Sequence, residues 1–521
     1  MVFEQQIPAS IFSPFGQKIT PRIHYKNLHS LLQTNLRMEL IKKHKKILLI
    51  SFSFGILYSL ISLVNHYCFR TYALDLGLYT NALFKYAHFQ LADSTMIKEY
   101  YEILLGGHFD LYLILFSPLI YLFGTYSLLI VQIIALIIGG IGVYNFFELS
   151  RSKNKIIPIL ATIYFYSFFG VFGALSFDYH SVVIASCIVP WFFISVRLNK
   201  KALSTFLLVL MLVSQENISL WVFFICLGLV IEYRNNTKKV YHLLLLSCIS
   251  FIYFIAVISF IIPYFSATNE YSGFLYSSIG NNTFDAFKSL LTNPIDNFKI
   301  LFTNHNNSVH GDFVKTELHI ILFASGLPLL IKKPQYILML VPIYFQKLFH
   351  DNNSIWGIGS QYNIEFAPIM AIGIFMVISE FNRVKLIKGM SVIILFFTIA
   401  STFRTMDNTI CFTDKSRIRF YQRGHYKKDY DVISVHRQLS KIPKDAIVSA
   451  QSPFVPHLSL RKNIYQFPII KNADYIIYFK NENCYPLTKE EFDSNIIELE
   501  HSKDWIILYN ESITILKKIS L

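Results

Sequence analysis

Long apolar runs separated by short polar connections dominate this chain. The clearest runs are Ile47–Val64, Ser127–Leu149, Ile156–Leu175, Leu243–Phe265 and Phe366–Ile378. A helix needs about 20 apolar residues to cross the hydrocarbon core of a bilayer, and several of these runs reach or approach that length. Two shorter runs, Leu318–Ile331 and Tyr336–Phe349, would have to tilt or borrow neighbouring residues to cross. The pattern predicts a polytopic transmembrane helix bundle, mainly α in fold class.

Composition supports a membrane protein. Hydrophobic residues make up 53% of the chain and charged residues 15%, whereas soluble domains carry roughly 25% charged residues. The mean hydropathy is +0.43. The net charge of +14 does not indicate a nucleic-acid partner, because the basic residues lie in short connections between apolar runs. We therefore expect the lipid bilayer, and no nucleic acid, as a partner.

Six basic connections define the predicted topology. They contain Lys42–Lys46, Arg151–Lys155, Arg197–Lys201, Arg234–Lys239, Lys332–Lys333 and Arg383–Lys388. Short loops rich in Lys and Arg stay in the cytoplasm, which gives about eleven spans, a cytoplasmic N-terminus and an extracytoplasmic C-terminus in the cell membrane. The predicted spans are 47–64, 127–149, 156–175, 181–196, 202–214, 218–232, 242–264, 318–331, 336–349, 364–380 and 389–403. Leu111–Phe123 does not fit this count, and we interpret it as an interfacial or re-entrant helix, with a short true span as the alternative.

The same pattern divides the chain into domains. Residues 1–46 form a cytoplasmic segment without the cleavage pattern of a signal peptide. Residues 47–403 form the membrane domain, with long outside loops at 65–126 and 266–317. Residues 404–521 are more charged, and their apolar runs shrink to strand length at Ala446–Ala450, Tyr475–Phe479, Trp505–Tyr509 and Ser512–Leu516. With a helix expected over Asp431–Leu439, the last domain is predicted to be a small extracytoplasmic α/β domain. The six cysteines show no paired spacing, so neither a disulfide framework nor a zinc site is indicated.

Acidic and histidine side chains gather on the predicted outside face. The candidates are Asp75, His108, Asp110, Asp178, His180 and Glu216, followed by Gln361 and Tyr362 in the polar stretch 350–365, and by His457. Glu216 interrupts a long apolar stretch, and ionisable groups at membrane depth face the bundle interior or a wet cavity. Each residue also has an ordinary explanation: Asp75 as a helix cap or solvated loop acid, and Glu216 as part of an exposed turn.

The motifs around these residues resemble a known family. They are Leu74–Tyr79, His108-Phe109 leading to Ser117-Pro118, Phe177–His180, Gln215–Asn217, Gln361-Tyr362 before Ala367-Pro368, and Ser449–Gln451 followed by Val455–Ser459. From about Tyr72 to the C-terminus the chain is similar to the multi-pass membrane family DUF2079, related to the GT-C glycosyltransferases. Gln215 and Asn217 replace the Lys and Asp of the family pattern, and Asp110 stands where that pattern has Ser-Pro. These differences change the charges around Glu216.

The resemblance implies a GT-C-like enzyme that transfers a sugar from a polyprenyl-phosphate-linked donor to an acceptor outside the cytoplasm. Direct displacement needs a carboxylate to take the acceptor proton and a cation for the phosphate leaving group. Asp75 and Glu216 are the catalytic candidates, and the other seven residues are candidate substrate contacts. A divalent cation, Mg²⁺ or Mn²⁺, is one option for the phosphate, with Asp75, His108 and Glu216 as candidate ligands. Arg70 and Lys315 are weaker candidates for the phosphate.

Two other classes of function remain open from the sequence. A transporter or lipid flippase without covalent chemistry would place polar residues at mid-depth in several broken spans, whereas here they gather at one end. A structural membrane protein whose outside domain binds a partner is the third possibility.

The topology predicts which cysteines an impermeant reagent can reach. Cys68, Cys411 and Cys484 are expected on the outside, and Lys200 on the cytoplasmic side. Thiol labelling of single-cysteine variants in intact cells measures this. Labelling at a cysteine placed near Lys200, but not at Cys411, would reverse the assignment.

Overall fold

The structure is a computed structural model of the chain, and it describes residues 22–150, 154–411 and 413–519. The described residues do not include residues 1–21 of the predicted N-terminal segment. They also do not include Arg151 and Lys153 of the second basic connection. The chain divides into two units, residues 1–50 and residues 51–521. The first unit contains the start of helix α1 (Arg22–Tyr67), and the second contains all the elements that follow.

The second unit is mainly helical and carries one small sheet. Its further helices are α2 (Leu78–Ala87), α3 (Tyr112–Phe116), α4 (Ile120–Phe123), α5 (Ser127–Leu149), α6 (Ile157–Ser167), α7 (Phe169–Leu175), α8 (Ser181–Arg197), α9 (Lys201–Leu212), α10 (Glu216–Glu232), α11 (Thr237–Ala256), α12 (Ile262–Phe265), α13 (Thr283–Thr292), α14 (Pro294–Ile300), α15 (Val314–Ala324), α16 (Pro334–Leu348), α17 (Asn353–Trp356), α18 (Phe366–Ser379), α19 (Val384–Asp407), α20 (Val432–Leu439), α21 (Val455–Leu458) and α22 (Lys489–His501). The strands are β1 (Val448–Ala450), β2 (Ile464–Gln466), β3 (Tyr475–Tyr478), β4 (Trp505–Asn510) and β5 (Thr514–Lys518).

Several helices are suited to crossing a bilayer. Within the described part of the chain, four helical segments are long and apolar enough: His44–Tyr67, Tyr112–Leu149, Thr237–Phe265 and Val384–Asp407. The pair α6 and α7, bent by 43°, makes a fifth if it is one span. Shorter apolar helices, α8, α9 and α18, lie among them. The chain is therefore a multi-pass membrane protein.

Two apolar runs fold differently from a simple span. The prediction of one continuous segment over 318–331 is wrong, because α15 ends at Ala324 and Gly326 adopts a positive φ of 103° before a 3₁₀ turn, Leu327–Lys332. The run Leu111–Phe123 divides into α3, a 3₁₀ turn and α4 before Gly124, whose φ is 56°. Glycine adopts such angles without a steric penalty, so both breaks are encoded locally.

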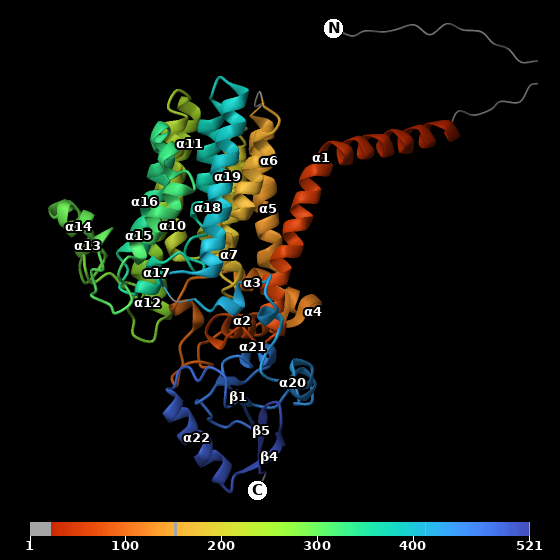
Figure 1. Cartoon of the computed structure of the whole chain (residues 1–521), viewed down its shortest axis with the longest axis vertical. Helices are drawn as coiled ribbons and strands as arrows, with labels where there is room; N and C mark the ends of the chain where they lie inside the picture. Colours follow the sequence, from red (N-terminus) through yellow and green to blue (C-terminus); the bar gives the residue numbers. More distant parts are fainter. Residues whose placement is uncertain (1–21, 151–153, 412, 520–521) are drawn as a thin grey trace, which may run out of the picture. The chain divides into compact units, whose positions relative to one another are not determined.

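Small residues on α5 let its neighbours approach closely, as they do in membrane helix pairs. A Cβ added at Gly140 would lie 2.1 Å from the Tyr166 ring of α6, and one at Gly139 would lie 2.9 Å from the Cys187 Cβ of α8. Figure 1 shows α5, α6, α10, α11, α16, α18 and α19 running along one direction, with α2, α3, α21 and the sheet at one end.

Among the described residues of the second unit, basic connections lie at the opposite end. Lys333 forms an ion pair with Glu380 at 2.7 Å, and Lys239 donates to the Arg197 carbonyl at 2.8 Å. Because consecutive helices run in opposite directions, the turn 176–180 and the turn 213–217 lie at the end away from these cations. The segregation of acidic and basic residues predicted from the sequence is thus present in the fold.

The sheet has the order β2-β1-β3-β5-β4. β1 pairs in parallel with β2 and β3, and β5 pairs antiparallel with β3 and β4. The four predicted strands are present, and so is the helix predicted at 431–439, which is α20. Strand β2 was not predicted, and α22 was missed although Thr488 and Glu491 form a capping box at its start. The motif Val455–Ser459 begins with helix α21.

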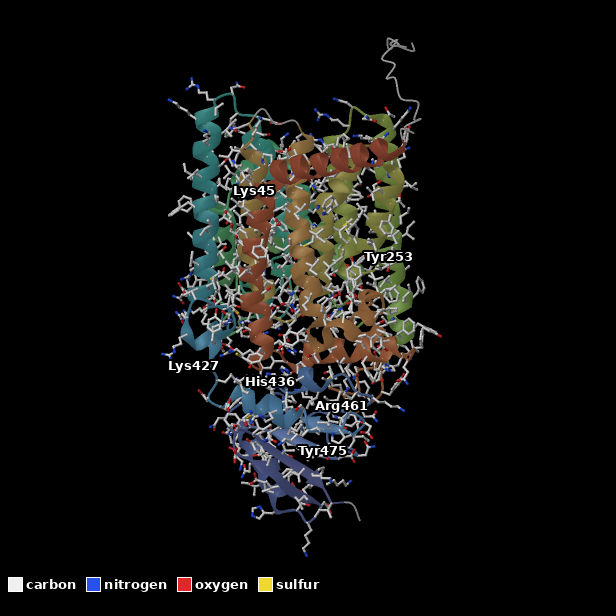
Figure 2. All side chains as sticks on the ribbon, turned by 90° about the vertical axis from the view of Figure 1, so that its right-hand side faces the viewer. Lys45, Tyr253, Lys427, His436, Arg461 and Tyr475 are labelled. Carbon is white, nitrogen blue, oxygen red and sulfur yellow. The ribbon has the colours of Figure 1, made fainter. Side chains whose placement is uncertain are left out.

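The sheet shares its hydrophobic core with the first outside loop. Phe69, Ala73, Leu78 and Met96 of that loop are buried in the same cluster as Val448 and its neighbours. The backbone N–H of Gln466 donates to the Met96 carbonyl at 2.7 Å. In Figure 2, His436, Arg461 and Tyr475 lie together in this part of the chain, beyond the end of the long helices. Cutting the chain after Phe403 would therefore expose apolar side chains of the first loop.

Burial changes how the topology must be probed. Cys68 and Cys411 are buried, so poor labelling at either position would report on packing and not on sidedness. Exposed Lys503 and Lys200 are better positions for introduced cysteines.

A buried ion pair ties the turn before α8 to the segment after α19. Arg417 Nη2 lies 2.6 Å from Asp178 Oδ1, and both side chains are almost fully buried. Asp178 also accepts the Tyr72 backbone N–H at 3.0 Å, and it has a positive φ of 51°. The Arg417 guanidinium lies 5.0 Å from the ring centres of both Tyr72 and Phe177.

Removing the cation should destabilise the fold. Arg417→Met leaves the Asp178 carboxylate buried without its partner, a change that costs about 3–5 kcal/mol. We expect a lower unfolding temperature in detergent and partial recovery when Asp178→Asn is added. Arg423→Met, at an exposed arginine of the same segment, is the matched control. Equal unfolding temperatures for the two single variants would contradict a stabilising role for the pair.

Candidate active site

A cavity of about 530 Å³ opens at the end of the bundle that holds the acidic turns. Its wall comes from the first outside loop, the start of α8, the turn before α10, the stretch 271–276, the end of α16 and the stretch 350–365. Seven of the nine predicted site residues line it: Asp75, His108, Asp110, His180, Glu216, Gln361 and Tyr362. Asp178 and His457 do not.

Asp75 reaches the cavity from a π-helical turn, Ala73–Gly77, that leads into α2. A residue of the C-terminal part fixes this turn, since the Ala73 N–H donates to Ser452 Oγ at 3.1 Å. A Cβ at Gly77 would lie 3.0 Å from Val455 Cγ1, so glycine permits this close approach. The Asp75 carboxylate is partly buried and forms no hydrogen bond or ion pair with the described residues. Burial raises the pKa of Asp75 to about 6, against the opposing charges of Arg417 and His108.

His108 and Glu216 form an ion pair in the same wall. His108 Nδ1 lies 2.8 Å from Glu216 Oε1, and the Phe109 N–H donates to Glu216 Oε2 at 3.3 Å. Glu216 is buried, whereas the side chain of His108 is 50% exposed. The Glu216 carboxylate raises the pKa of His108 to about 9. His108 thus supplies a cation next to Glu216.

Asp110 lies behind this pair. Its Oδ1 accepts the Tyr112 N–H at 2.9 Å, and its Oδ2 accepts the Ser181 hydroxyl. Burial raises the pKa of Asp110 to about 7, against these hydrogen bonds. Because both carboxylate oxygens have protein partners, Asp110 is better placed to position neighbouring groups than to take a proton.

Four more residues of the cavity wall each hold a buried polar atom without a hydrogen-bond partner in the described structure. The atoms are His180 Nε2, Asn217 Oδ1, Gln361 Oε1 and Glu365 Oε2. Burial lowers the pKa of His180 to about 4, so its ring is neutral. Buried polar groups are normally satisfied, and several unsatisfied groups around one cavity favour a ligand rich in hydroxyl groups.

A second pocket of about 290 Å³ adjoins the large cavity. It shares Asp75, Tyr79, His108 and Asp110 with the large cavity. Most of its remaining lining is apolar: Leu74, Leu78, Ile97, Leu104, Leu105 and Leu113. The free carboxylate of Asp75 therefore faces both a polar and an apolar compartment.

Sequence reasoning missed several residues of the cavity wall, among them two tyrosines and a lysine. Tyr271 and Tyr276 come from the loop 266–317, and Lys347 comes from the end of α16. Lys347 is buried and donates to the Gly357 carbonyl at 2.7 Å. A lysine near the outside end of an apolar run was the available signal for Lys347, whereas nothing in the loop sequence singled out the tyrosines.

The structure places the two remaining predicted residues elsewhere. Asp178 is held by Arg417 and Tyr72, as described above. His457 is half-buried and stacks on His66 with ring centres 4.1 Å apart. Its ring also lies 4.3 Å from that of Phe69. These positions join the first loop to the C-terminal part.

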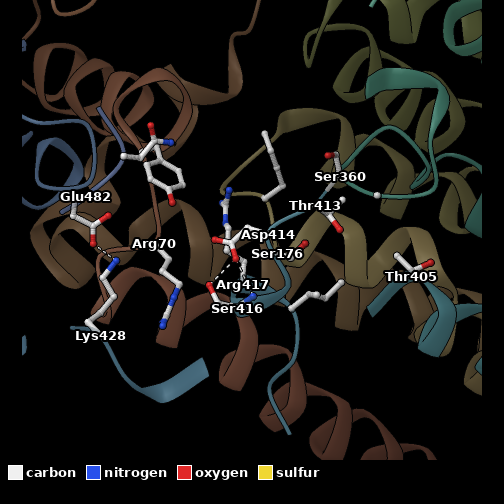
Figure 3. A pocket seen from close by; sticks show the side chains of 15 residues that line it. Arg70, Ser176, Ser360, Thr405, Thr413, Asp414, Ser416, Arg417, Lys428 and Glu482 are labelled. Carbon is white, nitrogen blue, oxygen red and sulfur yellow. Dashed lines mark hydrogen bonds and ion pairs between the residues drawn. The ribbon is translucent and has the colours of Figure 1, made fainter. Parts of the chain in front are cut away.

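The predicted phosphate candidates Arg70 and Lys315 are occupied by protein partners. Arg70 donates to the carbonyls of Gly424 and His425 at 2.9 and 2.7 Å. It lines a third pocket of about 440 Å³, in which Lys428 is paired with Glu482 (Figure 3). Lys315 lies 4.3 Å from the Trp356 ring centre and contacts His305 at 2.8 Å.

The proposed metal ligands do not form a metal site. Among the residues with described positions, no group of three or more His, Cys, Asp or Glu side chains has the arrangement that could hold an ion. Of the three candidates, Glu216 is engaged by His108 and the Phe109 N–H. We therefore derive no step of the chemistry from Mg²⁺ or Mn²⁺.

The fold and the cavity define a class: a multi-pass membrane protein with a polar, partly buried site at one end of its helices. Within that class, the chain belongs to the family of predicted membrane proteins DUF2079, whose model matches residues 65–514. The match begins just after the first span and includes every lining residue discussed above. No curated protein matches the chain.

The charge of His108 depends on Glu216, and this can be measured. Glu216→Gln should move the pKa of His108 from about 9 toward its ordinary value near 6.5. Because the folded-state pKa is raised, the contribution of the pair to stability is present below about pH 6.5 and is lost as the pH rises through 9. NMR titration of histidine-labelled protein reports the pKa. An unchanged pKa in Glu216→Gln, with Glu380→Gln as the exposed control, would contradict this assignment.

Proposed function

We propose that this protein transfers a sugar from a polyprenyl-phosphate-linked donor to an acceptor hydroxyl in the cavity beside Asp75. In this proposal the bundle crosses the membrane about eleven times, and the cavity and the sheet face the extracytoplasmic side. The support for sidedness is the collection of basic connections at the opposite end.

One observation carries the proposal. Asp75 and His108 line the same cavity, and both pKa values are raised: burial raises that of Asp75 to about 6, and the Glu216 carboxylate raises that of His108 to about 9. At neutral pH the carboxylate is ionised and has no hydrogen-bond partner, while the imidazole is protonated. Titratable groups with perturbed pKa values gathered in one cavity are typical of acid–base sites.

The two groups suit the two charge changes of a glycosyl transfer. The acceptor oxygen attacks the anomeric carbon and forms a new C–O bond, and the bond from that carbon to the phosphate oxygen breaks. The acceptor proton passes to the Asp75 carboxylate, and the lipid phosphate leaves with the bonding electrons. The protonated ring of His108 stabilises the negative charge that develops on the phosphate.

The two compartments suit two substrates. The large cavity, with its unsatisfied atoms on His180, Asn217, Gln361 and Glu365, would hold the sugar through its hydroxyl groups. The smaller apolar pocket would hold the acceptor beside Asp75. Tyr362, on the rim of the large cavity, offers an aromatic face for a sugar ring.

Replacing Asp75 tests the role of the carboxylate. Asp75→Asn should lower the transfer rate by about 10²–10⁴-fold, the usual contribution of a general base, while leaving donor binding intact. Protein in vesicles is incubated with a panel of undecaprenyl-phosphate-linked hexoses and pentoses, with cell membranes as the source of acceptor. Mass spectrometry measures the release of undecaprenyl phosphate. Asp504→Asn, at an exposed carboxylate in the C-terminal part, is the control.

The pH profile gives a second test of the same pair. The rate should fall below about pH 6, where Asp75 becomes protonated, and above about pH 9, where His108 loses its proton. Asp75→Asn retaining the full rate, or a profile without a limb near either value, would remove the pair from the mechanism. If none of the lipid-linked sugars releases undecaprenyl phosphate, that result would argue against the proposed substrate class.

A further inference from the structure

The connection between α12 and α15 exposes an unusual amount of apolar surface. Six large side chains on or just after α13 and α14 are between 51% and 75% exposed: Phe284, Phe287, Leu291, Ile295, Phe298 and Phe302. The first three follow the spacing i, i+3, i+7, and so do the last three, which puts each set on one side of its helical segment. Figure 1 shows α13 and α14 extending from the side of the bundle.

This surface is held in a fixed position. Asn282 caps α13 by accepting the Asp285 N–H at 2.9 Å, and Asn297 Nδ2 of α14 donates to the Ser289 carbonyl at 2.8 Å. On the inner side, Ala286 packs in a small cluster with Phe349 at the end of α16. The two helices thus form a unit with one apolar side against the bundle and another that no described residue covers.

The surroundings in the chain indicate what covers the outer side. The segment leaves a membrane-spanning helix, Thr237–Phe265, whose last turns expose Phe260 and Tyr264. It returns into α15, which exposes Ile320 and Phe323. Exposed apolar side chains thus lie on the spanning helix before this connection, on α13 and α14, and on α15 after it. Apolar surfaces of this size on water-exposed proteins are rare.

We propose that α13 and α14 lie in the membrane–water interface, with Phe284, Phe287, Leu291, Ile295, Phe298 and Phe302 inserted among the lipid acyl chains near the headgroups. Short helices with aromatic and aliphatic side chains on one face and lysines beside it bind bilayers in this way. Lys288 and Lys299 are exposed next to the apolar face and can reach the phosphates. This inference does not depend on the reaction proposed above.

The placement has a consequence for the cavity. Tyr271 and Tyr276, a few residues before α13, form part of the cavity wall. The next residue, Ser277, is fixed to Asp351, whose Oδ1 accepts its hydroxyl at 2.7 Å. The wall of the cavity is therefore continuous with a segment embedded in lipid, and a ligand carried on a lipid can approach from the bilayer on this side.

Photolabelling of the unmodified chain tests the proposal. The full-length protein is reconstituted in vesicles of phosphatidylethanolamine and phosphatidylglycerol that contain a phospholipid with a diazirine near the glycerol end of its acyl chain. Labelled peptides are mapped by mass spectrometry. We expect labelling over 283–302 similar to that of α19, where Phe396 is exposed, and about tenfold above that of β4. Strand β4 is the matched control, because Ile506, Ile507 and Leu508 are also exposed apolar residues.

A variant sharpens the comparison. Phe284→Ser combined with Phe287→Ser and Leu291→Ser should reduce labelling of α14 severalfold, whereas Thr292→Ser, at an exposed polar position of the same helix α13, should not. Labelling of 283–302 no higher than that of β4 in the unmodified chain would overturn the proposal, whatever the variants do. If 283–302 is protected from lipid photolabelling and crosslinks to a second copy of the chain, the result would overturn the proposal in favour of a protein interface.

Discussion

The arrangement of the site depends on the buried ion pair between Asp178 and Arg417. Asp178 lies in the turn between α7 and α8, Arg417 lies after the last long helix, and the same carboxylate also accepts the backbone N–H of Tyr72. Tyr72 immediately precedes the π-helical turn that carries Asp75. The helix bundle, the first outside loop and the C-terminal part therefore meet at one carboxylate. Because an unpaired charge in this place would be costly, the three segments are constrained to pack together, and Asp75 is fixed at the edge of the cavity.

The chemistry of the cavity follows from unequal burial of its charges. Glu216 is deeply buried and keeps the half-exposed ring of His108 protonated, whereas Asp75 is partly buried and has no partner. Asp110, with both oxygens engaged, supports the wall between the two. A site that presents a free carboxylate and a protonated imidazole to the same volume can accept a proton and stabilise an anion in one step.

The C-terminal part contributes to the site without entering it. Ser452 and Val455 hold the turn around Asp75, and Asn81 of α2 donates to the carbonyls of Ser459 and Arg461. His457, which the sequence suggested as a substrate contact, lies instead against His66 and Phe69. Its neighbours in the sequence, Ser452 and Val455, contact the turn from which Asp75 projects.

The sequence by itself determined the membrane class, most of the helical segments, four strands of the sheet and seven of the residues that line the cavity. Apolar run length and the placement of lysine and arginine are local properties, and a carboxylate or histidine at the end of an apolar run is costly unless it faces water or a cavity. Which of these groups share a cavity was decided by the tertiary structure. Asp75 and Glu216 are far apart in the chain, and only the packing of the first loop against the bundle and the sheet brings them to one wall. The same packing removed Asp178 and His457 from the site, because their partners, Arg417 and His66, lie in segments distant in sequence. It also added Tyr271 and Tyr276, which no feature of the loop sequence had singled out.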